Sequence, residues 1–124
     1  MTMTSDEFIK KKKQEVLDRK AIYTSKDISR NGKKHWIIEA RTMMIQTNHD
    51  EKVFVFERMK FDKFVGHQTR IIKKGTIQYR IGYYIIGKIG RMNGKWTWGQ
   101  YCPTIPIEDF DNLISLAKKE KTIL

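Results

Sequence analysis

The stretch from Glu51 to Phe61, EKVFVFERMKF, constrains the fold most, because it alternates regularly and starts apolar on both of its faces. Side chains that alternate with a period of two lie on opposite faces of a β-strand. Aromatic and β-branched residues favour this extended conformation. Both faces become more polar toward the end of the stretch, which indicates a strand that leaves the core there. One face is predicted to carry Val53, Val55, Glu57 and Met59, and the other Phe54, Phe56, Arg58 and Lys60.

The preceding segment, KKHWIIEARTMMIQT, predicts a second long strand over about residues 34–46. It ends at the turn-forming residues Asn48, His49 and Asp50. A short turn between two such segments is typical of a β-hairpin, so we expect the two strands to pair antiparallel. A further alternating segment, Ile77 to Ile85, predicts another strand.

A helix is predicted at each end of the chain. Thr4 and Glu7 have the spacing of a capping box, which predicts a helix over about residues 5–20. The C-terminal helix is predicted to begin near Pro106, with acidic residues in its first turn and lysines at its end, as the helix dipole favours. Its apolar stripe, at helical spacing, consists of Phe110, Leu113, Ile114 and Ala117.

The order of these elements is helix, antiparallel strands, helix. It predicts an α+β fold in which a curved antiparallel β-meander or half-barrel is flanked by an N-terminal and a C-terminal helix. No repeat, low-complexity segment or linker divides the sequence. Residues 1–124 are therefore expected to form a single domain.

Residues 82–101, GYYIIGKIGRMNGKWTWGQY, are predicted to form a hairpin. The dipeptide Asn93-Gly94 is the preferred sequence of a two-residue type I′ turn, in which both residues have positive φ. A turn closed by Met92 and Lys95 then sets the register of the two strands.

In this register Arg91 lies opposite Trp96 near the tip, and Ile89 lies opposite Trp98 farther from it. Two interpretations of the indoles are open: they cap the core, or they form a platform on which bases stack. We expect Trp98 to lie in the core and Trp96 to make the contact. The cations expected to bind phosphates beside these rings are Arg91, Lys88 and Lys95.

The charge of the chain predicts a polyanionic partner. Twenty-five Lys and Arg residues outnumber 14 Asp and Glu residues, which gives a formal net charge of +11 and a pI of about 9.8. Such an excess of positive charge attracts nucleic acid, and it would also attract an acidic protein or a membrane surface. Lys10 to Lys13 form a run on the predicted first helix, and we expect a solvated face there rather than a phosphate clamp.

The sequence also predicts that the protein does not insert into a membrane. No uninterrupted apolar run has membrane-spanning length, and residues 1–16 lack the hydrophobic stretch of a secretory signal. The single cysteine, Cys102, cannot form an internal disulfide and is expected to be a buried structural thiol. We therefore expect a soluble protein of the cytoplasm.

Residues suited to catalysis or metal binding do not form a motif. The histidines have no zinc-binding spacing, and Cys102 has no His or Asn in a motif around it. The carboxylates are expected to form surface salt bridges rather than a metal site of a nuclease. The sequence thus predicts no enzyme activity, no metal and no cofactor. The candidate residues are His35, His49 and His67, and, for a nuclease, Glu39, Asp50, Glu57 and Lys60.

We predict a small, basic, non-catalytic protein that binds nucleic acid through backbone charge and aromatic stacking. Single-stranded DNA or RNA is the favoured partner. The alternative is an interaction protein, such as an inhibitor or accessory subunit of a phage or mobile element, that binds another protein. The predicted site residues are Arg80, Lys88, Arg91, Lys95, Trp96, Lys73 and Lys74.

Overall fold

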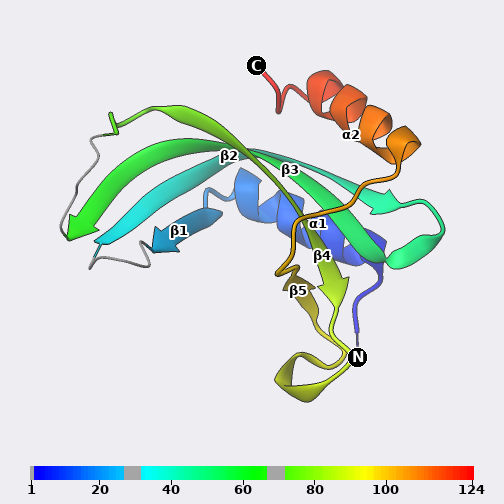
Figure 1. Ribbon diagram of the computed structural model, residues 1–124. Coiled ribbons are helices and arrows are strands. Elements are labelled where there is room, and N and C mark those ends of the chain that lie inside the picture. Colours follow the sequence, from blue (N-terminus) through cyan, green and yellow to red (C-terminus); the bar gives the residue numbers. More distant parts are fainter. Residues whose placement is uncertain (1, 27–31, 67–71) are drawn as a thin grey trace.

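The computed structural model of the protein describes residues 2–26, 32–66 and 72–124. Within them, a five-stranded antiparallel sheet has the strand order β1-β2-β3-β4-β5, so each strand pairs with its neighbours in the sequence (Figure 1). This curled meander with a helix at each end confirms the predicted α+β fold. The elements in chain order are α1 (Ser5–Leu17), β1 (Ile22–Lys26), β2 (Gly32–Gln46), β3 (His49–Gly66), β4 (Ile77–Ile86), the short 3-10 helix η1 (Gly90–Met92), β5 (Trp96–Trp98) and α2 (Ile107–Lys119).

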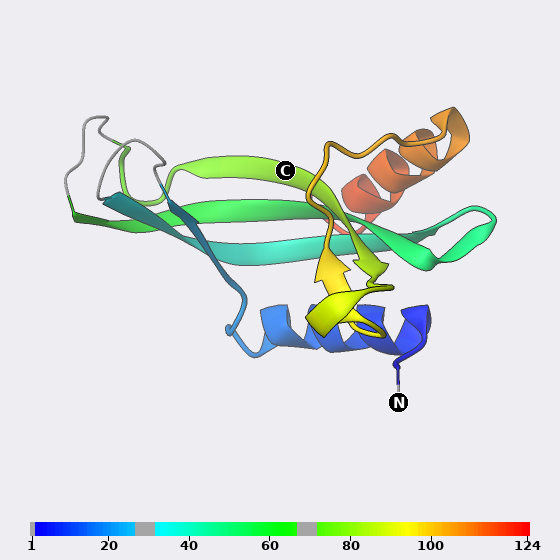
Figure 2. The ribbon, with the colours of Figure 1, turned by 60° about the horizontal axis from the view of Figure 1, so that its bottom comes forward.

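The two helices cover opposite faces of the sheet, with α1 below it and α2 above it in Figure 2. The predicted alternation in β3 explains this arrangement. Val53 and Val55 pack with Phe8 of α1, whereas Phe54 and Phe56 pack with Leu113 of α2. Because β3 is apolar on both faces at this point, the sheet has buried apolar clusters on both faces rather than one core and one solvated face.

Both helices end by the same local mechanism. At the end of α1, Arg19 adopts a φ of 57°, and the amides of Arg19 and Lys20 donate to the carbonyls of Val16 and Glu15. This is a Schellman motif, which satisfies carbonyls that the helix leaves unpaired. It ends α1 at Leu17, whereas the sequence predicted that the helix would continue to about residue 20. Lys121, with a φ of 62°, terminates α2 with the same pair of bonds.

The β2–β3 hairpin forms as predicted, but its turn is tighter. The strands leave only Thr47 and Asn48 between them, and Asn48 has a φ of 63°. His49 and Asp50, predicted to be turn residues, therefore belong to β3. Register shifts next to Trp36 and between Ile38 and Ala40 interrupt the pairing of β2 with β3. Such bulges bend a strand and increase its twist, which contributes to the curl of the sheet.

Candidate nucleic-acid interface

The hairpin that carries most of the predicted site residues has a different register from the predicted one. Tyr84 pairs with Trp98, and Ile86 pairs with Trp96. Arg91 therefore does not lie opposite Trp96, and the predicted register is wrong. Residues 87–95 form a longer loop that contains η1.

The turn type also differs from the prediction. Asn93 has φ −56° and ψ 126°, and Gly94 has φ 74°, which are the angles of a type II turn rather than of type I′. The amide of Gly94 donates to the carbonyl of Gly87 at 2.8 Å, and the Thr2 hydroxyl donates to the carbonyl of Gly94 at 2.8 Å. The bond within the loop and the contact with Thr2 of the N-terminal segment hold the loop in a conformation that local turn preference alone does not favour.

Trp96 docks on α1 rather than projecting from the hairpin. Its indole stacks on Phe8 with ring centroids 4.8 Å apart, and its Nε1 donates to the carbonyl of Met3 at 2.9 Å. Trp98 is also half-buried and meets Tyr84 edge to face, with centroids 5.1 Å apart. Both indoles thus pack against the core on the α1 side, the Trp96 ring as much as the Trp98 ring.

Docking of the hairpin on α1 creates a basic recess of about 310 Å³, which we call the hairpin–helix pocket. None of its lining residues is an aspartate or a glutamate. Lys11 and Lys95 are exposed, and Lys12 is half-buried, with its Nζ 5.3 Å from the ring centroid of Tyr84. Two members of the four-lysine run therefore face the hairpin instead of forming only a solvated face. The pocket is lined chiefly by Lys11, Lys12, Lys95, Phe8, Tyr84 and Trp96.

Tyr84, which lines the pocket, has a neutral hydroxyl group. Burial raises the pKa of the Tyr84 hydroxyl, and the negative charge of Glu57 raises it further against the smaller opposing effects of Arg41 and Arg80. The phenol therefore keeps its proton at neutral pH and can act as a hydrogen-bond donor.

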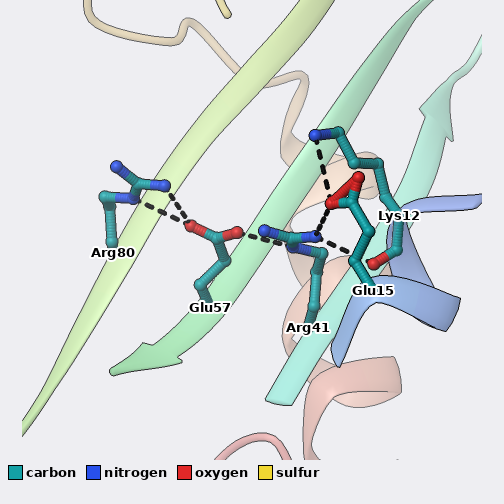
Figure 3. A network of polar contacts seen from close by, with 5 residues as sticks. All are labelled: Lys12, Glu15, Arg41, Glu57 and Arg80. Carbon is teal, nitrogen blue, oxygen red and sulfur yellow. Dashed lines mark hydrogen bonds and ion pairs between the residues drawn. The ribbon is translucent and has the colours of Figure 1, made fainter. Parts of the chain in front are cut away.

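A buried ion-pair network supports the pocket from inside (Figure 3). Glu57, with 0% of its side chain exposed, accepts from Arg41 Nε at 2.6 Å and from Arg80 Nε at 2.8 Å. Arg41 continues to α1, where its Nη1 donates to the carbonyl of Lys12 at 2.8 Å and lies 3.5 Å from Glu15. The expectation that Glu57 forms a surface salt bridge is wrong, because this residue lies in the central strand on the face that α1 covers.

Arg80, a predicted site residue, belongs to this network. Its Cζ lies 3.9 Å from the ring centroid of Tyr23 in β1 and 4.2 Å from that of Trp98 in β5. It therefore links both end strands of the curled sheet while its nitrogens bind Glu57. Gly82 permits the close approach of the indole, since an added Cβ there would overlap the Trp98 ring. The arrangement gives Arg80 a structural position beneath the hairpin.

The other predicted cations lie at the two ends of β4. Lys88 and Arg91 are exposed on the hairpin loop, where Lys88 pairs with Glu51 at 2.5 Å. Lys73 and Lys74 precede β4 at its other end, and Lys74 lies 3.7 Å from Asp62. The predicted residues therefore form two groups rather than one site.

Lys73 lines a second recess on the α1 face, with a volume of about 600 Å³. The sequence indicated no role for its aromatic and basic walls, because β1, which supplies one of them, was not predicted. The polar sequence of this short strand, IYTSK, gives a weak strand signal. The lining of this second recess includes Tyr23, Lys34, Trp36, Lys73, Thr76 and Gln78.

Among the described residues considered for catalysis, Glu39 and Lys60 form an ion pair at 4.0 Å, and Glu57 lies in the buried network. Cys102 is exposed, so its predicted burial is wrong. His35 lies 3.1 Å from the hydroxyl of Thr24, His49 is exposed, and His67 lies outside the described residues. Among the residues that are placed, no group of His, Cys, Asp and Glu has an arrangement that could hold a metal ion. None of the described helices has the length and apolar character needed to cross a membrane.

Comparisons with protein-family models, with curated proteins and with solved structures give no significant match to this chain.

Proposed function

We propose that the protein is a non-catalytic binder of single-stranded nucleic acid and that the hairpin–helix pocket binds a phosphate of the strand. One observation carries the proposal: Lys11, Lys12 and Lys95 come from two separate elements and line one recess without an acidic residue. Lysines that line one recess can bind phosphate as point charges. Lys12 also pairs with Glu15 at 3.4 Å, so Lys11 and Lys95 are expected to contribute most. Tyr84, whose hydroxyl stays neutral because its pKa is raised, lines the same recess.

The hairpin loop extends the proposed contact outward. Arg91 and Lys88 are exposed on it and can meet neighbouring phosphates. Trp96 has a smaller role than the sequence predicted, since Phe8 occupies one face of its half-buried ring. Charge therefore contributes more to the proposed binding than stacking does.

The size of the recess favours a flexible strand. A volume of about 310 Å³ admits one phosphate or one base of a strand that can bend its backbone into it. A duplex holds its phosphates on a stiff cylinder and meets such a recess only at the rim. We therefore propose single-stranded DNA or RNA as the preferred ligand, with weaker binding to duplexes through the net charge of +11.

Fluorescence anisotropy with labelled oligonucleotides tests the proposal. Single-stranded DNA, single-stranded RNA and the matching duplexes, each of about 20 nucleotides, are titrated at low and at physiological salt. We expect binding to the single strands that is tighter than binding to the duplexes and that weakens steeply with salt. If no polynucleotide binds even at low salt, the proposal fails, and an acidic surface on another protein becomes the better candidate partner.

A further inference from the structure

The first half of β4 has an open edge. β4 pairs with β3 from Ile77 to Ile85, but β5 pairs with it only at residues 84–86. The amide of Gly99 extends the β5 side by one bond, to the carbonyl of Tyr83 at 2.8 Å. Residues 77–81 of β4 therefore have a strand on one side only.

The alternation of an antiparallel ladder shows which groups point to this edge. Successive residues of a strand direct their amide and carbonyl to opposite neighbours. The carbonyl of Tyr83 points away from β3, and that of Thr76 points toward it, where it accepts from Phe61. The amides and carbonyls of Ile77, Tyr79 and Ile81 thus point to the open edge. Among the described residues, no hydrogen bond involves these six backbone groups.

The side chains along the edge are apolar and accessible. Ile77, Tyr79 and Ile81 are 36%, 44% and 37% exposed, and they share the face of the sheet that α2 covers elsewhere. Proteins usually protect an open edge with lysine, proline, a bulge or a short strand. The window 77–81 contains no lysine, proline or bulge, whereas the other end strand, β1, ends in Lys26.

We propose that this edge pairs with the same edge of a second copy of the chain, antiparallel and around a two-fold axis at Tyr79. The sequence of the window, IQYRI, is symmetric in its apolar positions. A two-fold axis at its centre places Tyr79 opposite the partner's Tyr79 and Ile77 opposite the partner's Ile81. Closed two-fold contacts of this kind join the same surface of both copies.

The charges in this register are compatible with pairing. Arg80 is the one charged residue of the window, and buried Glu57 accepts its hydrogen bonds. The register places Arg80 opposite the partner's Gln78, so no two like charges oppose each other across the edge. The repulsion that remains comes from the net charge of +11 on each copy. Salt screens this long-range repulsion, so the dimer is expected to strengthen as salt rises.

The window is short, which makes the expected dimer weak and reversible. Beyond Tyr83 the edge is occupied by Gly99, and before Thr76 the chain turns at Gly75, where φ is 91°. Pairing is therefore confined to five residues, and small interfaces of this kind are usually transient. Salt also separates this proposal from nucleic-acid binding, since salt strengthens the dimer and weakens polyanion binding.

Disulfide cross-linking tests the register. In a Cys102→Ser background, which removes the exposed native thiol, Tyr79→Cys places two thiols opposite each other. The Cα atoms of such a pair lie about 5.5 Å apart, within the range that a disulfide spans. Gln78→Cys in the same background is the matched control, because in this register it lies opposite Arg80 of the partner. We expect the Tyr79→Cys dimer to form about ten times faster than the Gln78→Cys dimer.

Tyr79 also packs on Phe56 and accepts from the amide of Leu124, so its replacement can disturb the fold. An equimolar mixture of Ile77→Cys and Ile81→Cys chains provides a second test, in which the mixed dimer should exceed both self-dimers. Sedimentation velocity of the unmodified protein is a third test. We expect a dimer fraction that grows with protein concentration and with salt. Equal cross-linking at residues 78 and 79, a mixture without excess mixed dimer, or a monomer under all conditions would each overturn the proposal.

Discussion

Trp96 stacks on Phe8 with their ring planes 11° from parallel, and this contact joins the hairpin to the first helix. The stack places Lys95 beside Lys11 and Lys12, so the basic pocket exists only while the hairpin is docked. Stability and binding are therefore expected to depend on the same aromatic pair.

Trp96→Ala should lower the free energy of unfolding by about 3 kcal/mol, because it removes a half-buried ring from the core beside Phe8. Urea denaturation followed by circular dichroism measures this change. Arg91→Ala is the control on the same hairpin, and since Arg91 is exposed its effect should stay within about 0.5 kcal/mol. An unchanged midpoint for Trp96→Ala would mean that its ring is not docked.

Glu57→Gln should cost about 3–5 kcal/mol, since it leaves the buried guanidinium of Arg41 with only the more distant, partly exposed Glu15 as counter-charge and weakens the hold on Arg80. Glu51→Gln removes the same charge from an exposed pair with Lys88 and should cost less than about 1 kcal/mol. Denaturant unfolding of the two variants gives the comparison. Similar losses for both would contradict the buried position of Glu57.

The fold was predictable where local patterns agree with long-range packing. The alternation from Val53 to Phe56 identified a strand with two apolar faces, and the capping box at Thr4 identified where α1 begins. β1 was not predictable in the same way, because its polar sequence becomes a strand only through pairing with β2. Hydrogen bonds and side-chain contacts with a neighbouring strand stabilise the extended conformation that the local sequence of such a segment does not favour.

The candidate site was less predictable because contacts between distant parts of the chain decide it. Asn93-Gly94 favours a type I′ turn locally, but Thr2, 92 residues away from Gly94, binds the loop in another conformation. Glu57 is charged, and charged residues usually lie at the surface. Only its position on the face shared with Val55 and Met59 indicated that it is buried. No sequence pattern indicated that Lys11 and Lys12 line a pocket together with the hairpin, since a lysine run on a helix is usually solvated.

Tyr84 should make the stability of the protein fall at alkaline pH. Its pKa is raised in the folded state, so the unfolded chain loses this proton first, at about pH 10, and is favoured as pH rises further. The contribution is therefore fully present below about pH 10 and is lost as pH rises through the folded-state pKa. Tyr84→Phe should flatten this part of the stability profile, measured by denaturant unfolding between about pH 8 and pH 11. Tyr101→Phe, at an exposed site, is the control and should leave the profile unchanged.

Cys102 should react fully with a thiol reagent in the folded protein, because its side chain is exposed. Titration with a disulfide reagent measures the reaction with and without denaturant. The folded protein should release one equivalent at a rate within about ten-fold of the denatured rate, since burial is what slows such reactions. A thiol that reacts only after unfolding would contradict the exposed position of Cys102 and agree with the burial that the sequence predicted.

The salt dependence of single-strand binding in matched lysine variants tests the central claim most directly. Lys11→Ala/Lys95→Ala removes two charges from the hairpin–helix pocket, and Lys118→Ala/Lys119→Ala removes two exposed charges from the end of α2, on the other face of the sheet. The pocket variant should bind single-stranded DNA at least about ten-fold more weakly, and its log–log salt slope should be shallower by about 0.7 for each phosphate that the variant no longer neutralises. The α2 variant should keep the parent slope. Equally weakened binding by both variants, or parental binding by the pocket variant, would contradict the assignment of this pocket as the nucleic-acid site.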